Sequence, residues 1–229
     1  MKVKQIKIEF NVTPEIKRFV YVYLITTKTG CVLVDSGVYG SQDVIEKAIT
    51  ESGHQPEEIK AVFLTHSHPD HIGTAHYFRE KYGAKIYASE GERPWIEDID
   101  LQFRERSIPN FYKLAGKSAA VDCVVKDGEE ISICDDILVQ VIGTPGHSVD
   151  EISYRIGKAV FIWRCRAGSG RYSNSGAFGK FKKIFGNTGE FEKCPNILPG
   201  LGSDLFHRNN GTKNKRCRRF AGGIGKNGT

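Results

Sequence analysis

Long apolar runs are missing from this sequence of 229 residues. No stretch reaches the roughly 18 consecutive apolar residues of a membrane-spanning helix. The first ten residues alternate Lys with Val, Ile and Phe and lack the apolar core of a signal peptide. We therefore expect a soluble, cytoplasmic protein with no membrane partner.

Paired cysteines are missing as well. The six cysteines contain no Cys-x-x-Cys and no regular spacing, so we interpret them as free thiols and not as a disulfide framework or a zinc ribbon. A chain of this length can bury a full core without disulfides. This favours one sizeable domain, alone or with a tail; the sequence does not indicate an oligomeric state.

An excess of positive charge is missing from most of the chain and is confined to its end. Residues 1–163 contain 19 Lys and Arg against 24 Asp and Glu, whereas residues 164–229 contain 14 against 3. The formal net charge of +6 therefore comes from the tail. Because nucleic-acid-binding domains carry basic surfaces, the acidic balance of residues 1–163 leads us to expect no nucleic-acid partner.

Alternation and helical spacing of apolar residues predict an α/β protein. Strands are expected at 3–10, 18–27, 31–34, 59–64, 86–88, 121–125, 130–134, 137–142, 152–156 and 159–162, and helices at 42–52 and 72–82. Residues 91–120 mix aromatic with charged residues and are expected to form a helical excursion over the histidine-rich loop described next. This order of elements is typical of a layered α/β fold.

A histidine-rich loop follows the expected buried strand at 59–64. Residues 65–71 read Thr-His-Ser-His-Pro-Asp-His, and imidazole and carboxylate groups are ligands that suit Zn²⁺. His66 and His68 lie two positions apart and can converge on one ion from an extended loop. Asp70 and His71 are offset from them and can serve a second ion.

His147 stands in a second strand-to-loop turn, Thr-Pro-Gly-His-Ser at residues 144–148. Three neutral histidines leave an open position for water, whose pKa a bound metal lowers from about 15.7 to roughly 7. Four ligand-type residues within six positions argue against a turn of ordinary surface histidines. His54 and His76, by contrast, are expected to be solvated, and His207 is at most a weak ligand candidate.

Together with Leu-Val-Asp-Ser-Gly at residues 33–37, these motifs resemble those of the metallo-β-lactamase superfamily, in its general metallo-hydrolase and glyoxalase-II-like branch. The similarity covers about residues 18–162. It implies a four-layer αββα sandwich, with residues 1–162 as the metallo-β-lactamase-like domain and the second half of the fold incomplete. It also implies one or two Zn²⁺ ions, with other divalent metals as alternatives.

The resemblance also implies roles for individual residues. His66, His68 and His147 would hold the first metal ion, and Asp70 and His71 the second. Asp35 would be a supporting residue that orients these ligands without binding the metal itself.

Residues 163–229 depart from the family pattern. The strands expected at 152–156 and 159–162 would form a hairpin around Gly157-Lys158. In the family a Gly-Asp follows this hairpin and its Asp bridges the two metals, but residues 163–166 read Trp-Arg-Cys-Arg. Residues 164–229 contain no Val, against 16 before them, and 13 Gly. Such a basic, Gly-rich composition is a poor core former.

Our hypothesis for this tail is a reading-frame shift near position 163. Skipping one base of the Trp codon gives Gly, and the next shifted codon can encode the expected Asp. Residues 205–224 can then be reread as a helix with apolar spacing. A natural, basic, disordered tail is the alternative.

The resemblance implies a zinc-dependent hydrolase, in which we expect metal-activated water to attack a small ester, thioester or lactone. Asp70 would be the catalytic residue that orients the water or accepts its proton. A nuclease of the same superfamily is an alternative, as is a catalytically impaired metal-binding remnant that lacks the bridging Asp. β-Lactam hydrolysis is less favoured because nothing in the sequence suggests secretion, and a nucleic-acid-binding tail is a further alternative.

Overall fold

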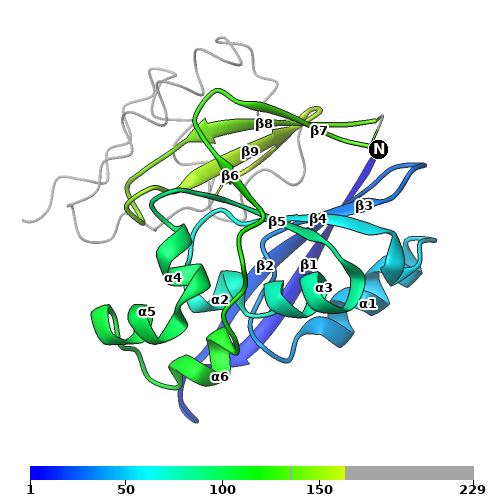
Figure 1. Cartoon of the computed structure of the whole chain (residues 1–229). Coiled ribbons are helices and arrows are strands. Elements are labelled where there is room, and N and C mark those ends of the chain that lie inside the picture. Colours follow the sequence, from blue (N-terminus) through cyan, green and yellow to red (C-terminus); the bar gives the residue numbers. More distant parts are fainter. Residues whose placement is uncertain (135, 163–229) are drawn as a thin grey trace, which may run out of the picture. The chain divides into compact units, whose positions relative to one another are not determined.

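The computed structural model describes residues 1–134 and 136–162. The tail at 163–229, with the domain boundary and frame shift proposed for it, lies outside the described residues. In the described part of the chain no helix has the length and apolar character needed to cross a membrane. The expected α/β class is confirmed: two β-sheets pack together, and helices cover the other face of the larger sheet (Figure 1).

The larger sheet has six strands whose spatial order is their order in the chain. The antiparallel part consists of β1 (Lys2–Asn11), β2 (Lys17–Thr26) and β3 (Cys31–Val34). The strands β4 (Ile59–Phe63), β5 (Lys85–Ser89) and β6 (Cys123–Val125) continue from β3 as parallel neighbours. All four residues of β3 are buried because both faces of the strand are covered, which explains its unbroken apolar sequence.

The smaller sheet is antiparallel, with the spatial order β10-β9-β8-β7. Its strands are β7 (Glu130–Ile133), β8 (Ile137–Gly143), β9 (Ile152–Ile156) and β10 (Ala159–Phe161). The last two form the hairpin expected from the sequence.

The described helices lie on one side of the larger sheet, opposite the smaller sheet (Figure 1). They are α1 (Gln42–Glu51), the 3-10 helix η1 (Pro56–Glu58), α2 (Pro69–Ile72), α3 (Ala75–Tyr82), α4 (Arg93–Glu97), α5 (Ile99–Glu105) and α6 (Phe111–Ala115). The last three are the helical excursion predicted for residues 91–120. Of the four expected layers, the described residues form three: helices, larger sheet and smaller sheet.

The prediction of a single helix at 72–82 was wrong. The structure ends α2 at Ile72 and begins α3 at Ala75. At the break, the backbone N–H of Gly73 donates to the carbonyl of Gly37 over 2.8 Å, and Oγ1 of Thr74 donates to the carbonyl of Ser36 over 2.5 Å. The bond of Gly73 takes its N–H out of the helical ladder, and the bond of Thr74 ties the next residue to the loop after β3, so the chain turns between the two helices.

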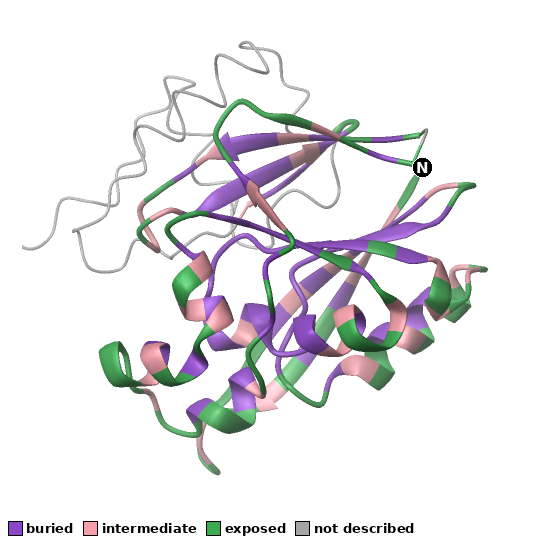
Figure 2. Cartoon of the chain, viewed as in Figure 1, coloured by how far each residue is buried: buried purple, intermediate pink, exposed green. Residues whose placement is uncertain are grey.

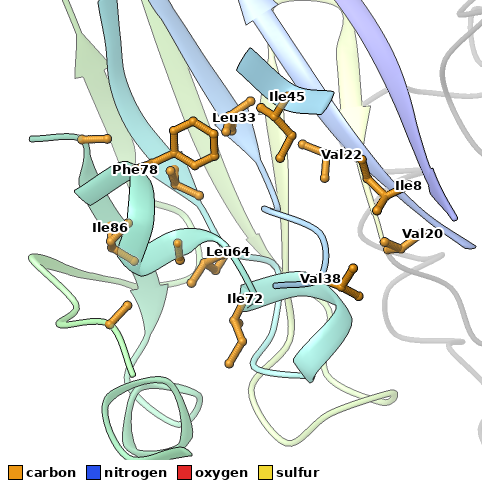
Figure 3. Packing of buried hydrophobic residues seen from close by; sticks show 14 of the residues in the cluster. Ile8, Val20, Val22, Leu33, Val38, Ile45, Leu64, Ile72, Phe78 and Ile86 are labelled. Carbon is orange, nitrogen blue, oxygen red and sulfur yellow. The ribbon is translucent and has the colours of Figure 1, made fainter. Parts of the chain in front are cut away.

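Buried apolar residues form two cores, one on each face of the larger sheet. Leu33, Ile45 and Phe78 belong to the core between this sheet and the helices (Figure 3). The core between the two sheets includes Phe63 and Tyr154, whose ring centroids are 5.2 Å apart. Figure 2 shows the resulting pattern, with buried residues along the central strands and exposed residues on the outer sides of the helices. Two covered faces give the central strands a fixed position from which loops can present functional groups.

Candidate metal centre

The histidine-rich loop begins where β4 ends. Because β3, β4 and β5 are parallel, their carboxyl ends meet at one edge of the sheet, which is where sites form in such sheets. From this edge β3 leads to Asp35 and β4 leads to residues 65–71. The connection between β8 and β9 brings His147 to the same edge, where the backbone N–H of Ile152 donates to the carbonyl of Thr65 over 2.9 Å.

Three of the predicted ligands, His66, His68 and His147, come together at this edge. Each offers one ring nitrogen, and these nitrogens lie within 4.8 Å of one another. The ring centroids are 4.5 to 4.8 Å apart, and Nδ1 of His68 is 2.9 Å from Nε2 of His147. We call these residues the histidine triad; their role as metal ligands stays a prediction.

Buried hydrogen bonds orient the ring of His66. Nδ1 of His66 is 2.9 Å from Oγ1 of Thr65, and this hydroxyl donates to the carboxylate of Asp35. Since the hydroxyl has one proton and gives it to Asp35, the ring N–H is assigned to Nδ1 and the lone pair to Nε2. Burial, and next the charge of His71, lower the pKa of His66 well below its usual value.

Arg106, the residue after α5, contacts the other side of the triad. Its Nη1 donates to Nε2 of His68, so the proton of this neutral ring is assigned to Nδ1, which faces His147. Burial and the nearby guanidinium lower the pKa of His68 to about 2. Burial, and next the charge of His71, lower the pKa of His147 to about 4. The triad is therefore neutral at physiological pH.

Asp35 links His71 to the same network. Asp35 is only 4% exposed, and its carboxylate lies 2.8 Å from Nδ1 of His71. The carboxylate also accepts from the backbone N–H of Thr65 over 2.8 Å. Burial alone would lower the pKa of His71, but the charges of Asp35 and Asp70 together raise it. Asp35 has a φ of 59°, a left-handed conformation that non-glycine residues rarely adopt and that is often found at functional sites.

Asp70 lies on α2 at the edge of the site. Its Oδ2 is 3.8 Å from Nε2 of His71, and its side chain is 28% exposed. The ring of His71 in turn lies 4.1 Å from that of His66, measured between centroids. The structure therefore places the predicted second-metal pair beside the triad, and its metal binding stays a prediction.

Four residues around the site were not identified from the sequence: Glu92, Gln102, Arg106 and Glu151. The side-chain amide of Gln102 donates to the carbonyl of Ser67 over 2.7 Å. The buried carboxyl of Glu151 accepts from the backbone N–H of His147 over 3.2 Å, and burial raises its pKa to about 8. The only signal for the first three was the expectation that residues 91–120 cover the histidine-rich loop.

The two other described histidines lie outside this network. His54 is half-buried, and its Nδ1 lies 2.9 Å from Oε2 of Glu58. His76 is only 6% exposed and stacks on Tyr39 with ring centroids 5.8 Å apart. The prediction that His76 is solvated was wrong, because the side of α3 that carries His76 packs against the loop after β3. His207 lies outside the described residues.

A comparison with protein-family models agrees with this fold. The family model of the metallo-beta-lactamase superfamily matches residues 16–162, and the chain belongs to this superfamily. The resemblance inferred from the sequence motifs is thereby confirmed.

Individual relatives are similar over different lengths. Probable metallo-hydrolase YqgX of Bacillus subtilis (strain 168) is 28% identical over 165 residues, which cover 72% of this chain and 71% of the relative. A hydroxyacylglutathione hydrolase of Bradyrhizobium sp. (strain BTAi1) is 30% identical over 102 residues, 44% of this chain but only 31% of the relative. The solved structure of BJP-1, a subclass B3 metallo-beta-lactamase of Bradyrhizobium japonicum, matches with a TM-score of 0.53 and 28% identity, over 62% of this chain and 53% of that one.

Proposed function

We propose that this chain is a metal-dependent hydrolase whose histidine triad binds a divalent cation, with Zn²⁺ as the first candidate. The observation that carries this proposal is the convergence of three imidazole nitrogens from two loops within 4.8 Å. Zn²⁺ in catalytic sites is commonly held by three protein ligands with one position left open. A bound ion of this kind lowers the pKa of water and polarises a carbonyl oxygen.

The donor groups fit such an ion. Metal binding requires neutral imidazole, and burial lowers the pKa of His66, His68 and His147. The hydrogen bonds that link Asp35 to Thr65 and Thr65 to His66 keep the ring proton of His66 on Nδ1, so that Nε2 presents its lone pair. The protein thus supplies imidazole ligands that are already uncharged at neutral pH. Nε2 of His66 presents its lone pair directly, whereas Nδ1 of His68 carries the ring proton and would have to lose it to bind a metal at that atom.

Asp70 is the residue to which we assign the catalytic proton transfer. It lies at the border between the buried triad and solvent, and an ionised carboxylate can orient a water molecule and accept its proton. Nε2 of His71 and Oδ2 of Asp70, 3.8 Å apart, are the proposed donors for a second ion. Asp35 positions His71 through the bond to Nδ1.

The proposed substrate is a small ester, thioester or lactone, and no nucleic acid. One relative is named a hydroxyacylglutathione hydrolase and another a probable metallo-hydrolase. Residues 1–163 hold more acidic than basic residues, which is unfavourable for a polyanionic substrate. Arg106 places one positive charge beside the triad, where an anionic group of a small substrate can be recognised.

The test is to assay the full chain, purified with Zn²⁺, against an aryl acetate, a glutathione thioester and a γ-lactone, before and after chelation. We expect hydrolysis of at least one class, loss of activity on chelation, and recovery when Zn²⁺ is restored. The Asp70→Asn variant should bind metal at the triad but hydrolyse that substrate at least about 100-fold more slowly, the scale of general acid–base catalysis. Metal binding without any hydrolysis would support the remnant that lacks the bridging Asp, and absence of metal binding would contradict the proposal.

A further inference from the structure

A buried carboxylate joins the two loops that carry the histidine triad. Glu92 lies after β5 at the start of α4 and is 2% exposed. Its Oε2 accepts from the backbone N–H of Ser67 over 3.0 Å and from Oγ of Ser67 over 2.5 Å. Its Oε1 accepts from the backbone N–H of Asp150 over 3.1 Å and from Oγ of Ser148. One carboxylate therefore receives four hydrogen bonds, two from each loop.

The positions of the donors in the sequence make this contact specific to the triad. Ser67 lies between His66 and His68, and Ser148 directly follows His147. The first loop extends from β4 of the larger sheet, and the second connects β8 and β9 of the smaller sheet. Glu92 thus bridges the two sheets at the place where the nitrogens of the triad converge.

The backbone of Ser67 is held on both sides. Glu92 binds its N–H and its hydroxyl, and Gln102 donates to its carbonyl over 2.7 Å. A residue whose N–H, carbonyl and side chain all have buried partners cannot rotate without losing several hydrogen bonds. The hydrogen bonds of Ser67 with Glu92 and Gln102 therefore fix the directions in which the chain presents the rings of His66 and His68.

Burying a carboxylate is unfavourable unless hydrogen bonds compensate for lost hydration, and an apolar residue of similar size is often at least as stabilising as a buried charge. The four donors around Glu92 satisfy this condition, but they do not explain why Glu and not an apolar residue occupies this position. The geometry explains it, because a carboxylate can accept hydrogen bonds from two loops at once and so set their separation, which no apolar side chain can do.

We propose that Glu92 is a positioning residue that sets the distance between His147 and the pair His66 and His68, and through it the affinity and geometry of the metal site. This proposal rests on the function proposed above, in which the triad holds the ion. Groups behind metal ligands commonly change metal affinity about 10–100-fold when they are removed.

The test compares Glu92→Gln with Glu90→Gln in the full chain. Gln keeps the shape of Glu but turns one acceptor oxygen into a donor, so it releases one of the two loops. Glu90 is exposed and two residues away, which makes it a matched control. Each protein is titrated with Co²⁺, whose visible absorption spectrum reports the coordination geometry, and with Zn²⁺ in competition with a chromophoric chelator. Thermal unfolding of the metal-free proteins is measured in parallel.

We expect Glu92→Gln to weaken Zn²⁺ binding about 10–100-fold and to change the Co²⁺ spectrum, while Glu90→Gln matches the wild type. A role in stability alone predicts a lower unfolding temperature with unchanged affinity and spectrum, and that result would overturn the proposal. If metal-free Glu92→Gln does not fold, Ser148→Ala replaces it, since it removes a single donor to Glu92; unchanged metal affinity in that variant would also overturn the proposal. Failure of the wild type itself to bind metal would remove the proposed function, and the role of Glu92 with it.

Discussion

At the scale of single residues, the candidate site depends on where each imidazole carries its proton. His66 has its ring proton directed to Thr65, and His71 has its Nδ1 directed to Asp35. These contacts leave Nε2 of both rings pointing away from Asp35. His68 differs, because the guanidinium of Arg106 occupies its Nε2 and places the ring proton on Nδ1. Metal binding at Nδ1 of His68 would require that proton to leave.

Arg106 therefore opposes metal binding in two ways, by its charge and by the tautomer that it favours. We predict that Arg106→Gln binds Zn²⁺ about tenfold more tightly than the wild type, because a unit charge about 4 Å away contributes about 1 to 4 kcal/mol at dielectric constants between those of water and of a protein surface. The measurement is competition with a chromophoric chelator. Arg104→Gln is the control, because Arg104 is exposed and lies in the last turn of α5, two residues before Arg106. Equal or weaker binding by Arg106→Gln would refute the prediction.

Glu151 gives a pH prediction for the metal-free protein. Its folded-state pKa, raised by burial to about 8, lies above the value of about 4.5 expected in the unfolded chain. Between these two values the folded protein holds the proton of Glu151 and the unfolded chain does not. The contribution of this carboxyl to stability is therefore complete below pH 4.5 and is lost as the pH rises through 8. Each pKa unit corresponds to about 1.4 kcal/mol.

Glu151→Gln should remove this dependence, because the amide does not titrate. Unfolding by urea in the presence of a chelator, from pH 5 to pH 8.5, should show the wild type losing stability relative to the variant as the pH rises. The exposed Glu57 supplies the control Glu57→Gln. Parallel pH profiles for Glu151→Gln and the wild type would show that the carboxyl titrates normally.

At the scale of elements, the site is assembled from loops that follow β3, β4 and β5 and from the connection between β8 and β9. The strands are held by two cores, so their ends have fixed positions. The helices α2 and α3 are short because the chain between them bonds to the loop after β3. That break keeps Asp70 and His71 on a helix of four residues directly against the site.

Gly73 makes this break possible. A Cβ at this position would lie 2.1 Å from the backbone nitrogen of Tyr39 and 2.3 Å from the carbonyl carbon of Val38, and backbone atoms cannot yield as a flexible side chain can. Gly73→Ala should therefore destabilise the protein by about 1–3 kcal/mol, the usual cost of overpacking. In an open helical position the same change stabilises by roughly 0.5–1 kcal/mol. Urea unfolding shows whether the substitution lowers or raises the free energy of unfolding. A stabilised variant would contradict the close packing of Gly73 against residues 38 and 39.

Most of these elements could be predicted from apolar spacing alone. The strands at 31–34 and 152–156 have the predicted bounds, and the other expected strands differ only at their ends. The break after Ile72 and the burial of His76 could not be predicted, because both depend on contacts with residues 36–39, which lie more than 30 positions earlier in the chain. Local spacing carries no information about such contacts.

The same reason explains which site residues were found. The motifs at 65–71 and 144–148 place ligand-type residues close together in sequence, and the structure brings His66, His68 and His147 together. Glu92 precedes α4 and Arg106 follows α5, in a segment that contains no metal-ligand pattern. Their contribution is visible only once the loop and the helices are folded against each other.

At the scale of the whole molecule, the sequence divides into an acidic part, residues 1–163, and a strongly basic tail. The frame-shift hypothesis predicts that the tail as written is not translated in the native source. Peptide mass spectrometry of that material should then lack the tryptic peptide of residues 172–180 and show peptides of the shifted frame. Detection of the peptide at 172–180 would establish the basic tail as genuine and favour a one-metal or inactive protein.

The most direct test of the metal centre is the number of Zn²⁺ ions bound per chain at equilibrium, measured by elemental analysis after dialysis of the full chain. We predict at least one ion per chain in the wild type and in His54→Ala, since His54 pairs with Glu58 outside the triad. His66→Ala should lose the ion held by the triad while it keeps the fold, because a metal ligand is lost from a loop. Equal Zn²⁺ content in His66→Ala and the wild type, or no bound Zn²⁺ in either, would contradict a metal centre at His66, His68 and His147.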